Sequence, residues 1–151
     1  IIVIYRCRIF FITYFIKKMI NKNILIIASN IKNYGLSGKF THYISMKSKK
    51  CGDTIKIELT KKDNKIQSMR YETESCIFCQ ATASLLSRKI NLFKIKTLEK
   101  DINILINTIK FKNDNLPLRL KIFDNIVNHQ NISRLECITL PFIALKKALK
   151  L

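Results

Sequence analysis

The hydrophobic pattern of the chain changes once, from strand-like to helix-like, and this change constrains the fold more than any other feature. Apolar and polar residues alternate over 54–60, and again over 65–74 after a polar turn. Ile66 is out of phase with its strand, which predicts a bulge near Ser68. After residue 76 the apolar residues recur at helical spacing. Strands followed by helices predict an α+β fold, with a small antiparallel sheet of about three strands packed against four to five helices.

Five segments have the residue pattern of helices. Asn21 or Asn23 can cap the first of them, and Pro117 separates the third from the fourth. A glycine-containing loop, NYGLSGKF, lies between the first helix and the strands. The predicted helices cover residues 21–30, 76–90, 96–110, 118–130 and 140–151.

The N-terminal segment differs from the rest of the chain. Residues 1–18 are apolar and aromatic, but their uninterrupted apolar run, 9–16, is too short to span a bilayer. The segment also lacks the small-residue cleavage site of a secretory signal. We therefore expect an over-extended or poorly ordered N-terminal extension in which Cys7 has no role. A membrane-associating segment is the alternative, and residues 19–151 are expected to form a single domain.

The net charge is strongly positive. A value of +18, from 28 Lys and Arg against 10 Asp and Glu, is typical of proteins that bind nucleic acid or anionic membranes. However, lysine far outnumbers arginine, and isoleucine and asparagine are abundant throughout, which indicates AT-rich codon usage. The basic residues form no dense block with interleaved aromatic residues. We therefore expect no nucleic-acid partner and no membrane partner, and a basic nucleic-acid-binding protein stays a distant third hypothesis.

Three cysteines are expected at junctions between elements. A free cysteine is most often a small buried residue. That interpretation suits Cys51 poorly, because glycine, aspartate and lysines surround it, and it suits Cys76 poorly, because a strand becomes a helix there. Unpaired backbone N–H groups and the positive end of the helix dipole lower the pKa of a thiol at a helix N-terminus. Cys137 is expected in the equivalent place, before the last helix.

Cys76 and Cys79 also form a Cys-x-x-Cys pair. Such a pair can be a redox couple or half of a zinc site. The chain has no second pair and no two histidines at finger spacing, so a closed zinc knuckle is not expected. Cys79 is expected in the core, and His42 and His129 on the solvated surface. The chain contains no motif of the common hydrolases or nucleotide-binding proteins.

Three cysteine-containing blocks occur in a specific order. They are CGDTIKIEL, SCIFCQATASLLSRKI and SRLECITLPFIALKKAL, preceded by ASNIKNYGLSGKF. Together they resemble the lead-in and the three cysteine blocks of the NifU-like iron–sulfur cluster assembly scaffolds, the IscU/SufU superfamily. The resemblance extends from about residue 22 to the end of the chain.

The resemblance implies a ligand set at one exposed end of the fold, where zinc, iron or a nascent [2Fe–2S] cluster is held. By position these ligands are Cys51, Asp53, Cys76 and Cys137. Thiolates are soft donors for iron and zinc, whereas a carboxylate is a harder, weaker ligand that releases its metal more easily. Gly52 lets the chain turn sharply between the first two ligands.

The resemblance also implies a role. A scaffold of this kind is not an enzyme: it receives sulfur from a cysteine desulfurase and passes the cluster to acceptor or carrier proteins, in the cytoplasm of a bacterial cell. Persulfide transfer needs an exposed nucleophilic thiolate, and Cys137 is the candidate acceptor, with Cys76 second. The alternatives are a SufU-like zinc-dependent sulfurtransferase and a degenerate paralogue with a structural role.

Three departures from the family pattern leave the sub-family and the bound metal open. Glu136 stands where IscU-type members have histidine before the third cysteine, and the stretch from Cys76 to Cys137 is longer than in that type. Ser75 replaces the usual glycine, and Cys79 stands where small polar or apolar residues are more common.

Overall fold

A computed structural model of the protein describes residues 21–112 and 115–151. The expected extension, residues 1–18, lies outside them. In chain order the elements are α2 (Lys22–Ala28), β1 (His42–Lys47), β2 (Thr54–Lys62), β3 (Lys65–Glu74), α3 (Ile77–Arg88), η1 (Ile90–Leu92), η2 (Ile95–Thr97), α4 (Leu98–Phe111), η3 (Leu118–Phe123), η4 (His129–Arg134) and α5 (Leu135–Ala148), where η marks a 3₁₀ helix. None of these helices is long and apolar enough to cross a membrane.

The three strands form one antiparallel sheet in the order β1-β2-β3, which confirms the predicted fold class. Asp63 and Asn64 connect β2 and β3, and both have positive φ, as a tight hairpin turn of this kind requires. Thr60 pairs with Ser68 but the next residue pairs with Ile66, so β3 carries one extra residue. The predicted bulge near Ser68 is therefore confirmed.

Strand β1 has no counterpart among the segments predicted from the sequence. Its residues do alternate, but its inward side chains, such as Ile44 and Met46, are only half-buried and its outward ones include Tyr43. This pattern is weaker than that of β2, where Ile55 and Ile57 are fully buried. An edge strand with a thin apolar face is difficult to distinguish from a loop by periodicity alone.

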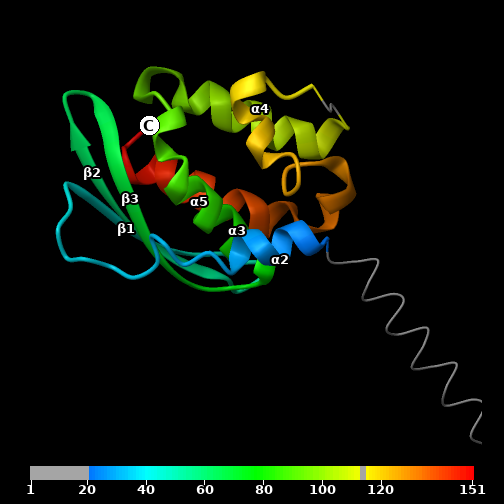
Figure 1. Cartoon of the computed structure of the whole chain (residues 1–151), viewed down its shortest axis with the longest axis horizontal. Coiled ribbons are helices and arrows are strands. Elements are labelled where there is room, and N and C mark those ends of the chain that lie inside the picture. The colour runs from blue at the N-terminus through cyan, green and yellow to red at the C-terminus, as the bar shows by residue number, and fades with distance from the viewer. Residues whose placement is uncertain (1–20, 113–114) are drawn as a thin grey trace, which may run out of the picture.

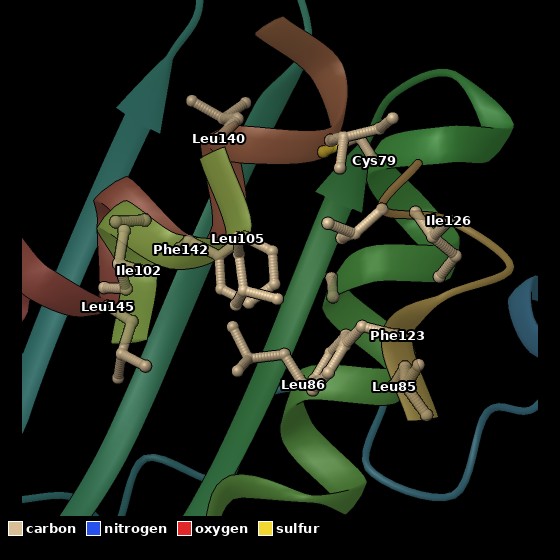
Figure 2. Packing of buried hydrophobic residues seen from close by; sticks show 14 of the residues in the cluster. Cys79, Leu85, Leu86, Ile102, Leu105, Phe123, Ile126, Leu140, Phe142 and Leu145 are labelled. Atoms are coloured by element: carbon tan, nitrogen blue, oxygen red, sulfur yellow. The ribbon is translucent and has the colours of Figure 1, made fainter. Parts of the chain in front are cut away.

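The helices cover one face of the sheet (Figure 1). Helices α3 and α5 contact the strands, while α2 packs on α3 and α4 packs on α5. Figure 2 shows the core between them, where Leu86 of α3, Leu105 of α4 and Leu145 of α5 meet. The rings of Phe93, Phe123 and Phe142 pack together there, with centroids 5.6–6.4 Å apart.

The opposite face of the sheet is crossed by the glycine-containing loop. Buried Glu58 of β2 accepts hydrogen bonds from the backbone N–H groups of Ser37 (2.7 Å) and Gly38 (3.0 Å) and from the Ser37 hydroxyl (3.0 Å). Glu72 of β3 accepts a further bond from Leu36 N (3.2 Å). Burial opposes ionisation of Glu58, but these bonds and the nearby Arg70 outweigh it and lower its pKa. A carboxylate therefore fixes the loop to the sheet.

The same loop begins on the outer edge of β3. Gly35 N donates to Tyr71 O (2.9 Å), and Tyr71 N donates to Asn33 O (3.2 Å). The Arg70 guanidinium holds this segment from the side by donating to Gly35 O (2.7 Å) and Tyr34 O (2.9 Å). Residues 33–35 thus add a short parallel bridge beside β3.

Two helix predictions were wrong in extent or type. Residues 118–123 form a 3₁₀ helix and residues 124–128 a turn and bends instead of one α-helix, and a second 3₁₀ helix begins at His129. Short 3₁₀ pieces of this kind are common as connectors between longer elements. The last helix begins at Leu135 instead of residue 140. The first helix was predicted with Asn21 as a possible cap, which is confirmed: its side chain accepts from Asn23 N at 2.9 Å.

Candidate functional site

The first part of the site is the loop from Ser48 to Asp53, between β1 and β2. Ser48 N donates to Asp53 O (2.8 Å), and the Ser48 hydroxyl accepts from the backbone N–H groups of Lys50 and Cys51, both at 3.3 Å. Gly52 has φ +74°, a conformation that disfavours side chains. This turn leaves Cys51 exposed and sends Asp53 inward, where its side chain is 6% exposed.

The sheet register brings the second cysteine to the same place. Thr54, at the start of β2, pairs with Glu74, at the end of β3, so the chain leaves β3 directly beside Asp53. Cys76 follows as the N-cap of α3, with extended backbone and no side-chain capping bond, as expected for a thiol at a strand-to-helix junction. Its backbone N–H donates to Asp53 Oδ1 at 3.1 Å.

The third cysteine comes from α5. Cys137 lies inside the first turn of that helix and is only 4% exposed, so the expected position before the helix was wrong. Pro141, four residues later, has no N–H to donate to the Cys137 carbonyl group. Burial, together with the neighbouring Cys76, Cys51 and Asp53, raises the Cys137 pKa above its usual range. The lowered pKa expected for a helix N-terminus is therefore not found at this thiol.

Three of the four predicted ligands gather closely. The ligand atoms of Cys51, Asp53 and Cys137 all lie within 4.8 Å of one another. For comparison, bonds of about 2.3 Å from sulfur to zinc place two ligands of one tetrahedral metal somewhat less than 4 Å apart. Cys76 is beside this group, since its backbone binds Asp53 and its thiol influences that of Cys137, but its sulfur is not one of the three atoms so gathered.

The donor set fits a thiophilic metal. Asp53 Oδ2 is buried and accepts no hydrogen bond from any group in the described part of the chain. A buried carboxylate oxygen without a donor is costly unless a cation satisfies it. Two thiols and this oxygen, with Cys76 adjacent, form a set of mixed sulfur and oxygen ligands suited to zinc or iron. The assignment of the four residues as ligands stays a prediction.

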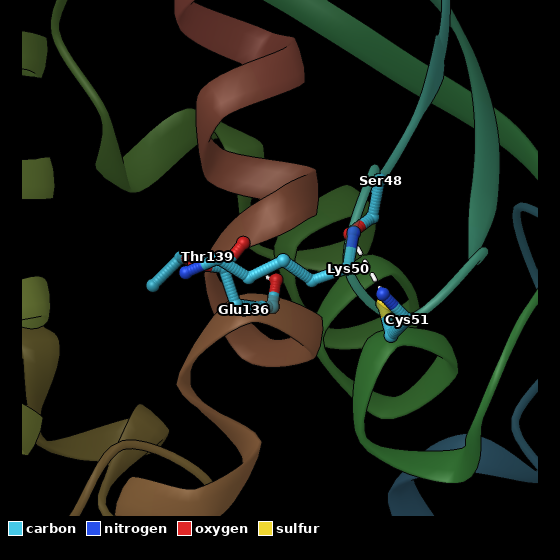
Figure 3. Close-up of polar contacts among 5 residues, drawn as sticks. All are labelled: Ser48, Lys50, Cys51, Glu136 and Thr139. Carbon is cyan, nitrogen blue, oxygen red and sulfur yellow. Dashed lines mark hydrogen bonds and ion pairs between the residues drawn. The ribbon is translucent and has the colours of Figure 1, made fainter.

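One ion pair at this site was not foreseen in the sequence. Lys50 Nζ donates to Glu136 Oε1 at 2.9 Å and so joins the residue before Cys51 to the residue before Cys137 (Figure 3). Both side chains are largely exposed, at 76% and 51%, so the pair adds little stability. The only signal in the sequence was the opposite charge beside two candidate ligands.

The remaining cysteine and the histidines lie elsewhere. Cys79 is completely buried beneath the site, as predicted, and burial raises its pKa to about 12. His42 contacts Thr41 Oγ1 (2.8 Å) and His129 contacts Ile109 O (2.8 Å). Both histidines are half-buried, so they are less solvated than expected, and neither joins the ligand group.

Comparison with known proteins agrees with this architecture. An uncharacterized protein of Borreliella burgdorferi is 26% identical over 129 residues, 85% of this chain and 89% of that protein. A NifU-like protein (N-terminal) from Brucella abortus has a similar structure, with a TM-score of 0.75, 22% identity, and coverage of 89% of this chain and 94% of that one.

A second solved structure is a putative iron–sulfur cluster assembly scaffold protein for the SUF system from Fervidobacterium islandicum. Its TM-score is 0.72 at 21% identity, covering 88% of this chain and 98% of that one. The family model described as the NifU-like N-terminal domain matches residues 19–150. The chain therefore belongs to the NifU-like N-terminal domain family of iron–sulfur cluster assembly scaffolds.

Proposed function

We propose that this protein is a scaffold on which a [2Fe–2S] cluster is assembled from iron and from sulfur supplied by a cysteine desulfurase. The observation that carries the proposal is the gathering of Cys51 and Asp53, from the loop before β2, with Cys137, from the first turn of α5, around a carboxylate oxygen without a donor. Iron is the cargo of this site, and zinc is an alternative occupant.

The ligands differ in how firmly they hold a metal. Thiolates bind iron tightly, whereas Asp53 is a harder donor whose Oδ1 is already occupied by the Cys76 N–H group. Asp53 is therefore the ligand that is released first when the cluster is transferred to an acceptor or carrier protein. Cys76 supplies the fourth ligand from the adjacent helix cap.

Exposure orders the thiols as sulfur acceptors. Sequence analysis favours Cys137, but this thiol is 4% exposed, whereas Cys76 is half-buried and Cys51 is exposed. A persulfide on the desulfurase therefore reaches Cys51 and Cys76 more easily than Cys137. The sulfur can then move between Cys76 and Cys137, because each persulfide transfer forms one S–S bond and breaks another. We place this exchange in the cytoplasm of a bacterial cell, as the resemblance implies.

The alternative function uses the same residues differently. In a SufU-like zinc-dependent sulfurtransferase, a thiolate leaves zinc to take the persulfide, and no cluster is built. Mixed sulfur and oxygen ligands suit zinc as well as iron, so the ligand set favours neither. Members of the family are generally carriers and not enzymes.

Metal analysis and anaerobic reconstitution test the proposal. Purified protein is incubated with ferrous iron, a cysteine desulfurase, cysteine and a dithiol reductant, and the visible absorbance of a [2Fe–2S] cluster is recorded. We expect a cluster in the native protein and none in Cys51→Ser or Cys137→Ser, while Glu58→Gln, which lies outside the ligand group, retains it. Stoichiometric zinc that iron does not displace, without visible absorbance, would favour the sulfurtransferase.

A further inference from the structure

One element of the sequence is not used by the proposed function: the second cysteine of the Cys76-x-x-Cys79 pair. Cys76 is the N-cap of α3 and Cys79 is the third residue of the helix. Side chains three residues apart in a helix are neighbours, with Cβ atoms about 5–6 Å apart. A disulfide needs Cβ atoms about 4 Å apart, so a small rearrangement of the first turn brings the two thiols into bonding range.

The surroundings of Cys79 place its thiol directly beneath the metal site. Its sulfur lies 3.9 Å from the Thr73 hydroxyl group at the end of β3. Asp53 and Cys76 are both close enough to act on it electrostatically. Solvent does not reach Cys79, which is 0% exposed. The thiol is therefore protected from external oxidants and partners but adjacent to Cys76 (Figure 2 shows it among the buried residues).

Cluster assembly requires a source of electrons at this site. The sulfur of a persulfide is at the oxidation level of elemental sulfur, whereas a cluster contains sulfide, so each sulfur atom needs two electrons. A pair of thiols that becomes a disulfide releases two electrons. The pair at the start of α3 is the one Cys-x-x-Cys in the chain.

We propose that Cys79 is a resolving thiol that releases sulfide from a persulfide on Cys76, an inference that rests on the proposed function. The Cys79 sulfur attacks the Cys76 sulfur of Cys76–S–SH while its proton passes directly to the outer sulfur, so that no free thiolate has to form at this buried position. A Cys76–Cys79 bond forms, the S–S bond of the persulfide breaks, and the outer sulfur leaves with the Cys79 proton as hydrogen sulfide. Two thiol sulfurs are oxidised and one persulfide sulfur is reduced to sulfide. A dithiol reductant then restores both thiols.

The geometry explains why Cys79 suits this role better than Cys51 or Cys137. Those two cysteines and Asp53 form the group whose ligand atoms lie within 4.8 Å of one another, and Cys76 is not part of that group. A disulfide between Cys76 and Cys79 therefore leaves all three gathered ligands free to hold iron. Sulfide is released beside that iron instead of into solvent.

The test follows a single round of sulfur transfer in the full chain without iron or external reductant. Reduced protein is mixed anaerobically with one equivalent of glutathione persulfide, and the free sulfide is measured against a blank without protein. Trypsin cleaves after Arg70 and Arg88, so the peptide 71–88 contains Cys76 and Cys79 and no other cysteine. We expect about one sulfide per chain and a peptide that is lighter by two hydrogens.

The variants Cys79→Ala and Cys79→Ser provide the matched controls. In both variants the peptide should stay heavier by one sulfur atom at Cys76. Sulfide should be released at about one tenth of the native rate, or more slowly still. The peptide measurement on the native chain needs neither variant, so a folding defect does not affect it. Native protein that retains the persulfide, or that joins Cys76 to Cys137 across two peptides, would overturn the inference and leave the scaffold intact. Failure to bind both persulfide and iron would overturn both proposals.

Discussion

Two buried carboxylates lie five residues apart in the sequence, and they differ in how they are satisfied. Glu58, within β2, is 4% exposed and accepts three hydrogen bonds from Ser37 and Gly38. Asp53, just before β2, is 6% exposed, and within the described residues its side chain accepts a hydrogen bond from the Cys76 N–H group. Its second oxygen has no donor among residues 21–112 and 115–151.

This difference teaches that burial alone does not identify a functional acid. A carboxylate whose oxygens are all hydrogen-bonded holds structure together, and its ionisation is favoured. A carboxylate with one free buried oxygen beside two thiols is arranged for a cation that arrives later. The number of donors, and not the exposed area, separates the loop anchor from the candidate ligand.

The largest expected contrast is in stability without metal. Glu58→Ala should lower the free energy of unfolding by about 3 kcal/mol, because three donors lose their acceptor. Asp53→Ala should change it by less than about 1 kcal/mol, because the lost Cys76 bond is offset by removal of a poorly solvated charge. Urea unfolding of both variants with chelator present measures this. Equal losses in the two variants would contradict the contrast.

The ranking of the two residues should reverse when the lifetime of the bound cluster is measured, since substitution of Asp53 should then have the larger effect. Asp53→Ala should make a reconstituted cluster longer-lived in air, because the labile ligand is gone. Cys51→Ser should instead weaken metal retention so far that no cluster accumulates, because it removes a thiolate ligand. The decay of visible absorbance and competition with a chelator report the two effects, and Glu58→Gln serves as the control that should change neither. A cluster that decays faster in Asp53→Ala than in the native protein would refute the role assigned to this ligand.

A third difference should appear on acidification. The pKa of Glu58 is lower in the folded protein than its ordinary value of 4.5, so its contribution is complete above about pH 4.5 and is lost as the pH falls through the folded pKa. The stability gap between native protein and Glu58→Gln should therefore narrow below pH 4.5. Urea unfolding at a series of pH values from 7 to 3 checks this. A difference in the free energy of unfolding that stays constant over this pH range would mean that the charge of Glu58 does not contribute to stability.

The smallest expected effects concern the lysines beside Cys51. Lys49→Glu/Lys50→Glu should slow sulfur transfer from a desulfurase at low salt, because basic side chains there favour an acidic partner surface. Lys50 already pairs with Glu136, so Lys49→Glu alone is the cleaner variant. Exchanging the pair, as Lys50→Glu/Glu136→Lys, should alter stability by less than about 1 kcal/mol. Unchanged transfer rates in both lysine variants would indicate that these charges reflect codon usage only.

The sequence was sufficient for the parts of the fold where local pattern and packing agree. The alternation in β2, the out-of-phase Ile66 and the cap at Asn21 each predicted what is found, because each depends on neighbouring residues. Strand β1 and the start of α5 were missed, since their apolar faces are defined by the helices and strands that pack on them. The buried Leu120, Phe123 and Val127 fit a period of 3.6, so periodicity alone could not distinguish the 3₁₀ helix and turns from an α-helix.

The residues of the candidate site were predicted from the family resemblance, but the pKa of Cys137 and the ion pair beside the site were not. Local pattern identified the cysteines as unusual, but their gathering depends on a register in which Thr54 lies opposite Glu74. The raised pKa of Cys137 depends on burial by distant segments, which opposes the local effect of the helix N-terminus. The Lys50–Glu136 pair joins residues 86 apart in sequence, so no window of sequence contains it.

The short bridge of residues 33–35 along β3 has a consequence for self-association. Unpaired N–H and C=O groups on an outer strand are a template for another copy of the chain, and a ten-residue strand offers a long one. Tyr71 has both backbone groups occupied by Asn33 and Gly35, and Arg70 places a cation against the bridging segment. A strand from a second molecule therefore meets an interrupted edge. Replacing Gly35, whose φ is +89°, would loosen this cover and turn β3 into a site of aggregation.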